Sequence, residues 1–510
     1  MALSRVASTG TAPRTLGEQL RRRKPIVFAQ QHHPGEELAR NLSTFQLTMF
    51  GVGATVGTGI FFVLGEAVPK AGPAVLISFL VAGIAAGLSA LAYAEMASAI
   101  PVSGSTYSYA YHALGEGVAV VIAGCVLLEY GVATGAVAVG WSSYFNELLH
   151  SLFGFQLPEA LSVSPIPGSD GVATGGIINL PAVILIGLCA LLLIRGATES
   201  ARINTIMVLI KLGVLTLFSV IAFTAFKADH FDNFWASGFA GVSAAAGTIF
   251  FSFIGLDAVA TAGEEVKNPQ KALPRAIIAA LCIVSGIYIL VAMAGLAAKP
   301  VAFFSSPEAA DAGLAQILKD ITGNEVWSTI LAAGAVISIF SVTLVSLYGQ
   351  TRILFSISRD GMVSRRFTEV NPKTMTPVYN TIVVAVVVAL IGGFVPSDYL
   401  WDTVSIGTLM AFSVVAIGIM VLRRTDPDLE RPFKIPGYPV TPLLTIASCI
   451  YIMWGLAPIT WAIFGAWIAI VVVAYLFYGR HHAVLNHYRT PEEIAEPLGR
   501  FADRDDEDQR

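Results

Sequence analysis

The stretch of sequence that decides the fold runs from Gly51 to Phe62 and reads GVGATVGTGIFF. Glycine weakens a helix by up to about 1 kcal/mol per residue relative to alanine, so this cluster predicts a helix that is interrupted around Thr58. An interrupted helix at membrane depth is tolerated only around a cavity, where the second half-helix offers free N–H groups to an anion. The stretch therefore predicts a binding site built from main-chain atoms.

Two other interpretations apply to this stretch. The spacing of Gly53 and Gly57 is also that of small residues at a close contact between two helices, and the sequence alone leaves this possibility open. A dinucleotide-binding loop is excluded, because the run is not G-x-G-x-x-G and no strand precedes it.

The rest of the chain has the composition of a membrane protein. Of its 510 residues, 55% are hydrophobic and 13% are charged, whereas a soluble globular chain carries roughly 25% charged residues. From about Ser43 to Tyr478 the sequence is a succession of long apolar stretches, and about 20 such residues cross a hydrocarbon core. The short alternating strands of a barrel are absent, so we expect an all-α polytopic membrane protein.

We expect twelve transmembrane helices, with boundaries uncertain by about four residues. Their expected centres are Val56, Ala85, Gly131, Leu188, Leu212, Phe251, Val284, Ser341, Val386, Ala411, Ala447 and Ile468. The chain then divides into an N-terminal tail (1–42), a first half (43–226), a second half (238–424), two further helices (438–479) and a C-terminal tail (480–510). The acidic run Asp503–Asp508 is expected to be a solvated terminus.

Lysine and arginine predict the orientation. If both termini are cytoplasmic, 26 of the 31 basic residues lie in inside segments and four lie outside, which is the positive-inside bias of a correct topology. We therefore expect a multi-pass protein of the plasma (inner) membrane. The run Arg21–Lys24 has no apolar core after it and is not a secretory signal. Since the basic residues reflect topology, no nucleic-acid partner is expected.

Four ionisable residues fall within the expected spans: Glu95, Glu129, Lys211 and Asp257. Such a residue costs about 2.5–3.5 kcal/mol at mid-helix, so each is expected to face the protein interior or a wet cavity. Lys211 lies near the bilayer centre, where burial disfavours its charged form and makes it a candidate proton carrier. The alternative is a lysine fixed in a structural pair with Asp257 or with a main-chain carbonyl.

A second interruption is expected in span six, where Gly247–Asp257 reads GTIFFSFIGLD. Spans one and six each open a half of five spans, and because five is odd the second half must have inverted topology. Interrupted segments at corresponding places in inverted repeats point to a midplane binding site in a secondary transporter. The two breaks are therefore expected to meet around one site.

Four segments carry a resemblance to a known family. They are Gly53–Phe62, Tyr93–Tyr107, Ile254–Pro269 and Ser358–Met362. Together they resemble the amino acid–polyamine–organocation superfamily, and within it bacterial members of the cationic amino acid transporter family. The resemblance runs in consistent order from about Leu42 to Gly479. It implies a leucine-transporter-type fold with a 5+5 inverted repeat, helices 1 and 6 broken, two extra helices and alternating access.

The resemblance also implies which residues bind and couple. N–H groups of the first break would hold a substrate carboxylate, carbonyls of the second break would receive its ammonium, and Phe251 would be a gate. The substrate-binding residues implied are Thr55, Gly57, Thr58, Gly59, Glu129, Ala133, Phe251, Ser252 and Ile254. Lys211 occupies the place of a proton-coupling lysine, with Ser338 and Ser341 beside its amine. Glu129 would either face a cationic substrate side chain or hold the third helix in place.

These inferences predict a secondary active transporter, and not an enzyme, that takes cationic or small neutral L-amino acids by proton-coupled symport. No motif of a membrane hydrolase is present, and the absence of any Gly-Lys dipeptide excludes a Walker-type pump. The four cysteines fall in separate spans with no paired spacing, so neither a metal nor another cofactor is expected. A non-transporting sensor, an exchanger and a uniporter of the same fold remain alternatives.

Overall fold

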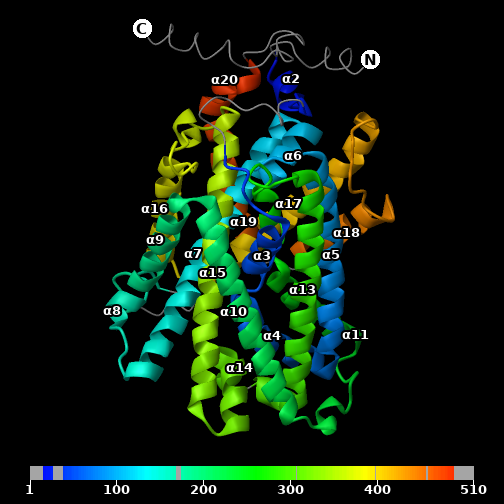
Figure 1. Ribbon diagram of the computed structural model, residues 1–510. Coiled ribbons are helices and arrows are strands. Elements are labelled where there is room, and N and C mark those ends of the chain that lie inside the picture. The colour runs from blue at the N-terminus through cyan, green and yellow to red at the C-terminus, as the bar shows by residue number, and fades with distance from the viewer. Residues whose placement is uncertain are drawn as a thin grey trace.

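The computed structural model describes residues 15–26, 38–167, 174–305, 307–396, 398–454 and 458–486. Over these ranges the chain is helical and forms no β-strand, which agrees with the expected all-α fold. Most of the predicted terminal tails, including the acidic run Asp503–Asp508, lies outside the described residues. Figure 1 shows helices standing side by side in one bundle, with α2 (Leu16–Arg21) and α20 (Arg480–His482) at one end, here called the terminal end.

The apolar helices match the expected spans in position. Eight helical segments of the described chain are long and apolar enough to cross a bilayer: Val63–Ala99, Glu116–Phe153, Ala197–Thr224, Gly238–Thr261, Pro269–Ala298, Glu325–Arg359, Thr403–Thr425 and Pro458–His482. Three shorter apolar helices are also present: α9 (Leu180–Arg195), α16 (Val378–Phe394) and α18 (Val440–Trp454). Each of the twelve expected centres falls on one of these helices or on a break, and the crossing by all twelve stays a prediction.

The first half of the chain forms an interrupted helix followed by four continuous ones. These are α3 (Thr44–Thr55) with α4 (Thr58–Ala71), then α5 (Val75–Ala99), α7 (Glu116–Phe153), α9 and α10 (Ala197–Thr224). Two short helices connect them, α6 (Ser105–Ala113) after α5 and α8 (Glu159–Ser162) after α7.

The second half repeats this order. It consists of α11 (Gly238–Phe250) with η4 (Phe251–Phe253) and α12 (Ala258–Thr261), then α13 (Pro269–Ala298), α15 (Glu325–Arg359), α16 and α17 (Asp398–Thr425). Helix α14 (Pro307–Thr322) connects α13 to α15 and lies at the end of the bundle opposite the terminal end (Figure 1). Helices α18, α19 (Pro458–Ala474) and the π-helical turn η7 (Tyr475–Gly479) complete the described chain before α20.

The first apolar helix is interrupted at the glycine cluster. Helix α3 begins after Ser43, whose side chain accepts a hydrogen bond from the N–H of Gln46, and it ends at Thr55. Helix α4 begins at Thr58, after Gly57 with φ −123° and ψ −142°. The interruption leaves the last carbonyls of α3 and the first N–H groups of α4 without partners inside a helix.

The second interruption lies between η4 and α12. Ile254 is extended, with φ −63° and ψ 141°, and Gly255 follows with φ +110°. Glycine is the residue that adopts a positive φ without strain, so its place in the sequence explains where the helix breaks. The helix resumes at Ala258.

Buried ion pairs gather at the terminal end. They join Arg22 to Glu116, Lys24 to Asp360, Arg352 to Glu265, Arg359 to Glu264, and Arg423 to Glu95. The bridge between Leu42 and Val266 adds two main-chain hydrogen bonds, from Leu42 N–H to the Glu265 carbonyl and from Lys267 N–H to the Leu42 carbonyl. These contacts hold the half-helices α3 and α12 against α15 and close this end of the bundle.

Candidate functional site

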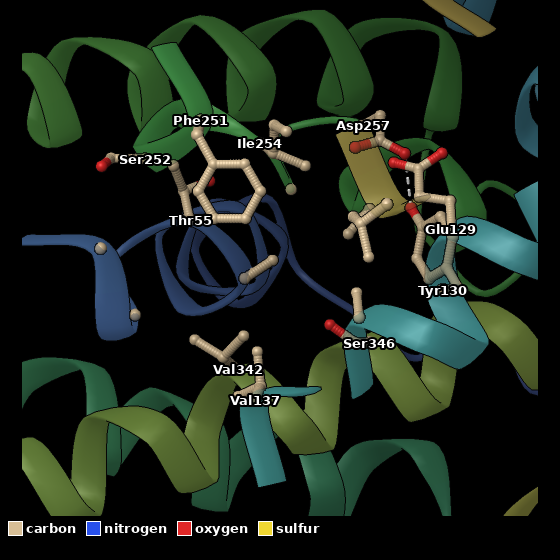
Figure 2. A pocket seen from close by; sticks show the side chains of 17 residues that line it. Thr55, Glu129, Tyr130, Val137, Phe251, Ser252, Ile254, Asp257, Val342 and Ser346 are labelled. Carbon is tan, nitrogen blue, oxygen red and sulfur yellow. Dashed lines mark hydrogen bonds between the residues drawn. The ribbon is translucent and has the colours of Figure 1, made fainter. Parts of the chain in front are cut away.

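A cavity of about 70 Å³ lies between the two breaks and the helices α7, α15 and α17 (Figure 2). Its lining consists of Ala54, Thr55, Gly57, Gly59, Glu129, Tyr130, Ala133, Val137, Phe251, Ser252, Ile254, Gly255, Asp257, Ala258, Val342, Ser346 and Val404. This volume has room for several water molecules. The space is therefore suited to a small polar ligand.

The two breaks touch each other through glycine. A Cβ atom on Gly59 would lie 2.6 Å from the Ser252 hydroxyl oxygen, and one on Gly255 would lie 2.8 Å from the Ala54 carbonyl oxygen. The contact at Gly255 is to a main-chain atom and its φ is positive, so this position requires glycine, whereas a methyl group on Gly59 would displace the Ser252 side chain. The two interrupted segments consequently present their main-chain atoms to the same small space.

These main-chain atoms have opposite polarity. The start of α4 carries unpaired N–H groups and no side-chain cap, so its partial charge is positive. The helix does not continue beyond η4, so the last carbonyl groups of this turn have no partners in a following helical turn and its partial charge is negative. The pair can bind a ligand with a carboxylate at one end and an ammonium at the other without any charged side chain.

A pair of acidic side chains forms one corner of the cavity. Tyr130 donates a hydrogen bond of 2.5 Å to Asp257 Oδ2, and Glu129 lies beside them in Figure 2. Glu129 Oε2 and Asp257 Oδ1 are buried and have no hydrogen-bond partner within the described ranges. Two neighbouring buried carboxyl groups, each with one oxygen that has no partner in the described ranges, are costly unless a proton or a cation accompanies them.

The opposite part of the wall is apolar. Ala133 and Val137 come from α7, Val342 from α15 and Val404 from α17. Figure 2 places Val137 and Val342 next to each other below the first break, away from Glu129 and Asp257. A ligand side chain directed to this region would meet methyl groups.

Lys211 lies behind the first break and is fully buried. Its ammonium donates to the carbonyls of Gly53 at 2.9 Å and Val56 at 2.6 Å, with the Ser341 hydroxyl 3.4 Å away. The Ser338 hydroxyl donates to the same Val56 carbonyl at 3.0 Å. Of the two possible partners of Lys211, the structure shows the main-chain carbonyls. The other, Asp257, is bonded to Tyr130 instead.

The structure brings most of the predicted residues together. All of the predicted substrate-binding residues whose side chains the structure describes line the cavity, and Thr58, whose side chain is not among them, is the first residue of α4. The lining residues that the sequence did not single out include the apolar Val137, Val342 and Val404 on α7, α15 and α17. Val137 and Val342 are each four residues beyond a predicted residue, Ala133 and Ser338, so helical spacing could have identified them. Asp257 is predicted from the sequence as a possible partner of Lys211, and the structure places it at the cavity instead.

Glu95 differs from the other ionisable residues of the expected spans. It lies in the last turns of α5, away from the cavity, and receives two hydrogen bonds from Arg423 at 2.9 and 2.6 Å and one from the Ile435 N–H at 2.7 Å. Glu95 therefore joins α5 to α17 and to the segment before α18 at the terminal end.

A larger cavity, of about 410 Å³, lies on the side of the site away from the terminal end. It is lined by residues of α4, α7, α14 and α15, among them Phe61, Tyr144, Leu314, Lys319 and Ala335. Tyr144 is two turns beyond Val137 on α7, and Ala335 is two turns before Val342 on α15. The larger cavity thus lies further along α7 and α15 than the central one, toward the end of the bundle opposite the terminal end.

Comparison with known proteins gives consistent matches over most of the chain. The model of a family described as amino acid permease matches residues 42–487. The methylthioribose transporter of Bacillus subtilis is 40% identical over 466 residues, covering 91% of this chain and 99% of that protein. The branched-chain amino acid permease BcaP of the same organism is 42% identical over 466 residues, covering 91% and 98%. Cationic amino acid transporter 2, vacuolar, of Arabidopsis thaliana is 36% identical over 422 residues, covering 81% and 64%.

Proposed function

The chain belongs to the amino acid permease family of the amino acid–polyamine–organocation superfamily, and from this premise we propose that it is a secondary active transporter of L-amino acids. The observation that carries the proposal is the meeting of two broken helices, with opposite partial charges, around one cavity. Interrupted helices at corresponding positions of two repeats are where secondary transporters hold their substrates.

The substrate backbone is bound by the breaks in this proposal. Its carboxylate accepts hydrogen bonds from the N–H groups of Thr58 and Gly59, at the positive end of α4, beside Gly57, whose own N–H donates to the Thr55 carbonyl. Its ammonium donates to the carbonyls of Ser252 and Ile254 at the second break. Phe251, whose ring points into the cavity in Figure 2, covers the bound molecule.

The side chain of the substrate is small or branched and uncharged in this proposal. The apolar wall of Ala133, Val137, Val342 and Val404 supports it, because an aliphatic side chain gains about 25 cal/mol for each Å² that it buries there. The name of BcaP, a branched-chain permease, fits the same class. A cationic amino acid is the second candidate, and the unpaired oxygens of Glu129 and Asp257 favour it.

Coupling to protons is assigned to Lys211. A charged Lys211 holds the Gly53 and Val56 carbonyls, which belong to the end of α3. When the proton leaves, the amine becomes a weaker donor and this end of α3 is released from α10. One proton moved through 100 mV supplies about 2.3 kcal/mol, roughly a fiftyfold accumulation, so one such site suffices.

The orientation follows from the distribution of charge. We place the terminal end in the cytoplasm of a plasma (inner) membrane protein, because this gives the positive-inside topology. The buried ion pairs then close the cytoplasmic side, and the larger cavity opens toward the outside. The domain division at 43–226 and 238–424 gives two inverted five-helix halves that work by alternating access.

A binding and uptake experiment tests the function. The purified protein is first screened by thermal shift against the twenty amino acids, since a ligand that binds the folded state raises the apparent stability. Proteoliposomes with an inward proton gradient are then tested with radiolabelled leucine and arginine. We expect saturable leucine uptake that exceeds arginine uptake. Binding without uptake would indicate a sensor, and uptake insensitive to the proton gradient would indicate a uniporter or an exchanger.

A further inference from the structure

Tyr288 on α13 lies between the two broken helices. Its hydroxyl is 2.9 Å from the Thr55 carbonyl oxygen, at the end of α3, and 2.9 Å from the Ser252 carbonyl oxygen, in η4. The residue is fully buried and does not line the cavity. It thus contacts both breaks from outside the binding space.

The ring of Tyr288 is held in a fixed position. It packs edge-to-face against Phe253, with ring centroids 5.2 Å apart, and against Phe79, with centroids 6.4 Å apart. Phe253 is the last residue of η4 and Phe79 lies on α5, so the ring is held between the second break and a continuous helix, and its hydroxyl stays beside both carbonyls. Only its hydrogen can turn from one carbonyl to the other.

A tyrosine hydroxyl has one hydrogen to donate. It can therefore satisfy the Thr55 carbonyl or the Ser252 carbonyl at full strength, but not both at once. Thr55 O has a second donor, the N–H of Gly57 at 2.9 Å, whereas no other hydrogen bond to Ser252 O is found in the described ranges. Without a ligand, the Tyr288 hydroxyl therefore donates to the Ser252 carbonyl in preference to the Thr55 carbonyl, which already has a donor.

We infer that Tyr288 is a positioning residue that couples the two ends of a bound amino acid. The inference rests on the proposed function, in which the substrate ammonium donates to Ser252 O. Once the ammonium is there, the Tyr288 hydrogen turns to Thr55 O and fixes the end of α3. The start of α4, three residues further along, is then held in the geometry that receives the carboxylate.

Ligands with one end missing separate this role from a merely structural one. L-leucine carries both ends, 4-methylpentanoate lacks the ammonium, and 3-methylbutylamine lacks the carboxylate. A tyrosine that only stabilises the site would affect all three ligands alike. If Tyr288 couples the two charged groups, its loss lowers the affinity only for a ligand that carries both of them.

The experiment measures the affinity of the purified full-length protein for each of the three ligands by thermal-shift titration. In Tyr288→Phe we expect the leucine affinity to fall about fivefold, the effect of one lost hydrogen bond, while each one-ended ligand changes by less than about twofold. Tyr93→Phe is the matched control, because it removes another buried hydroxyl, bonded to Thr106 at 2.6 Å. Its leucine affinity should stay within about twofold of wild type.

Equal losses for all three ligands in Tyr288→Phe, or no loss for leucine, would overturn the inference. A failure of the proposed substrate class is recognised separately, because the wild-type protein would then not bind leucine. In that case the same comparison is made with L-arginine, 5-guanidinopentanoate and agmatine, which differ from one another in the same two groups.

Discussion

The Tyr130 hydroxyl lies 2.5 Å from Asp257 Oδ2 and joins α7 to the second break. Asp257 is buried, and the described residues offer no partner to its other carboxylate oxygen. The position of this acid at the cavity therefore depends on a single side-chain hydrogen bond. A movement of the second break is therefore coupled to α7 through this bond.

Removing this hydroxyl should impair transport strongly. A hydrogen bond to a charged group contributes about 1.5–3 kcal/mol, so we expect Tyr130→Phe to lower leucine uptake about tenfold or more. Initial rates in proteoliposomes measure this. Tyr109→Phe serves as the control, because the buried Tyr109 hydroxyl has no partner in the described ranges and its loss should leave the rate nearly unchanged. Equal rates in the two variants would show that the Tyr130 bond has no part in transport.

Replacing Lys211 with methionine should remove the proton dependence of accumulation. Met keeps much of the side-chain volume but cannot donate to the Gly53 and Val56 carbonyls or carry a proton. We expect Lys211→Met proteoliposomes to lose the roughly fiftyfold accumulation that one proton can drive at 100 mV. Uptake across a series of imposed pH gradients measures it. Accumulation that still follows the gradient would remove Lys211 from the coupling role.

A methyl group on Gly255 should abolish the site. Gly255 has φ +110°, and a Cβ there would lie 2.8 Å from the Ala54 carbonyl oxygen. We expect Gly255→Ala to lose at least about tenfold in leucine affinity by thermal-shift titration, since strain of about 1–3 kcal/mol distorts both breaks. Gly247→Ala in α11 is the control: a Cβ there has no heavy atom within 4 Å, so helix propensity predicts unchanged or slightly higher stability. Similar affinities in the two variants would contradict the role of the breaks.

The sequence identified the breaks better than their surroundings. Glycine clustering at Gly57 and the glycine at Gly255 predicted where the helices are interrupted, because backbone freedom belongs to the residue type itself. The sequence does not single out Val342 and Val404, because an apolar residue that faces a cavity is of the same type as one that faces the core.

The partners of Lys211 were also beyond sequence reasoning. The carbonyls of Gly53 and Val56 are available only because the helix ends there, and a main-chain group carries no signature in the sequence. Glu95 shows the opposite case. Its charge marked it as a possible functional residue, but its pairing with Arg423 depends on chain segments far apart in the sequence.

The buried Glu116 should be important for stability. It accepts hydrogen bonds from Arg22 at 2.7 Å, Gln19 at 3.0 Å and Tyr475 at 2.6 Å, and so ties both terminal segments to α7. Breaking a buried ion pair costs about 3–5 kcal/mol, because the remaining charge is left unpaired. We expect Glu116→Gln to lower the apparent melting temperature clearly.

The exposed pair of Lys319 and Glu325 provides the control for Glu116. Its members are 2.8 Å apart, and the Glu325 side chain is 78% exposed. A surface pair contributes about 0–1 kcal/mol, so Glu325→Gln should leave the melting temperature nearly unchanged. If Glu116→Gln melts at the same temperature as Glu325→Gln, the terminal segments are not held by this carboxylate.

His112 should make the protein sensitive to acid. It lies on α6, outside the expected spans, where burial and the nearby charge of Lys24 lower its pKa from the ordinary 6.5 to about 4. Between these two pH values the unfolded chain binds a proton that the folded chain does not. The free energy of unfolding therefore falls by about 3 kcal/mol as the pH drops through this range.

The variant His112→Asn tests this pH dependence. Asn can keep the hydrogen bond that His112 Nδ1 makes with the Ser108 carbonyl at 2.7 Å, but it does not titrate. We expect its melting temperature to decrease less than that of wild type between pH 7 and pH 4. Parallel curves for the two proteins would assign the acid sensitivity to other groups.

The bridge between Leu42 and Val266 joins the segment that leads into α3 to the segment that follows α12. Its two main-chain hydrogen bonds, at 2.9 and 3.1 Å, do not depend on side chains. These bonds therefore link the half-helices α3 and α12 at the terminal end, so that the two move together. A movement of α3 that opens the cavity toward the terminal end therefore displaces α12 as well. It also breaks the Arg352–Glu265 and Arg359–Glu264 ion pairs, which join the segment after α12 to α15.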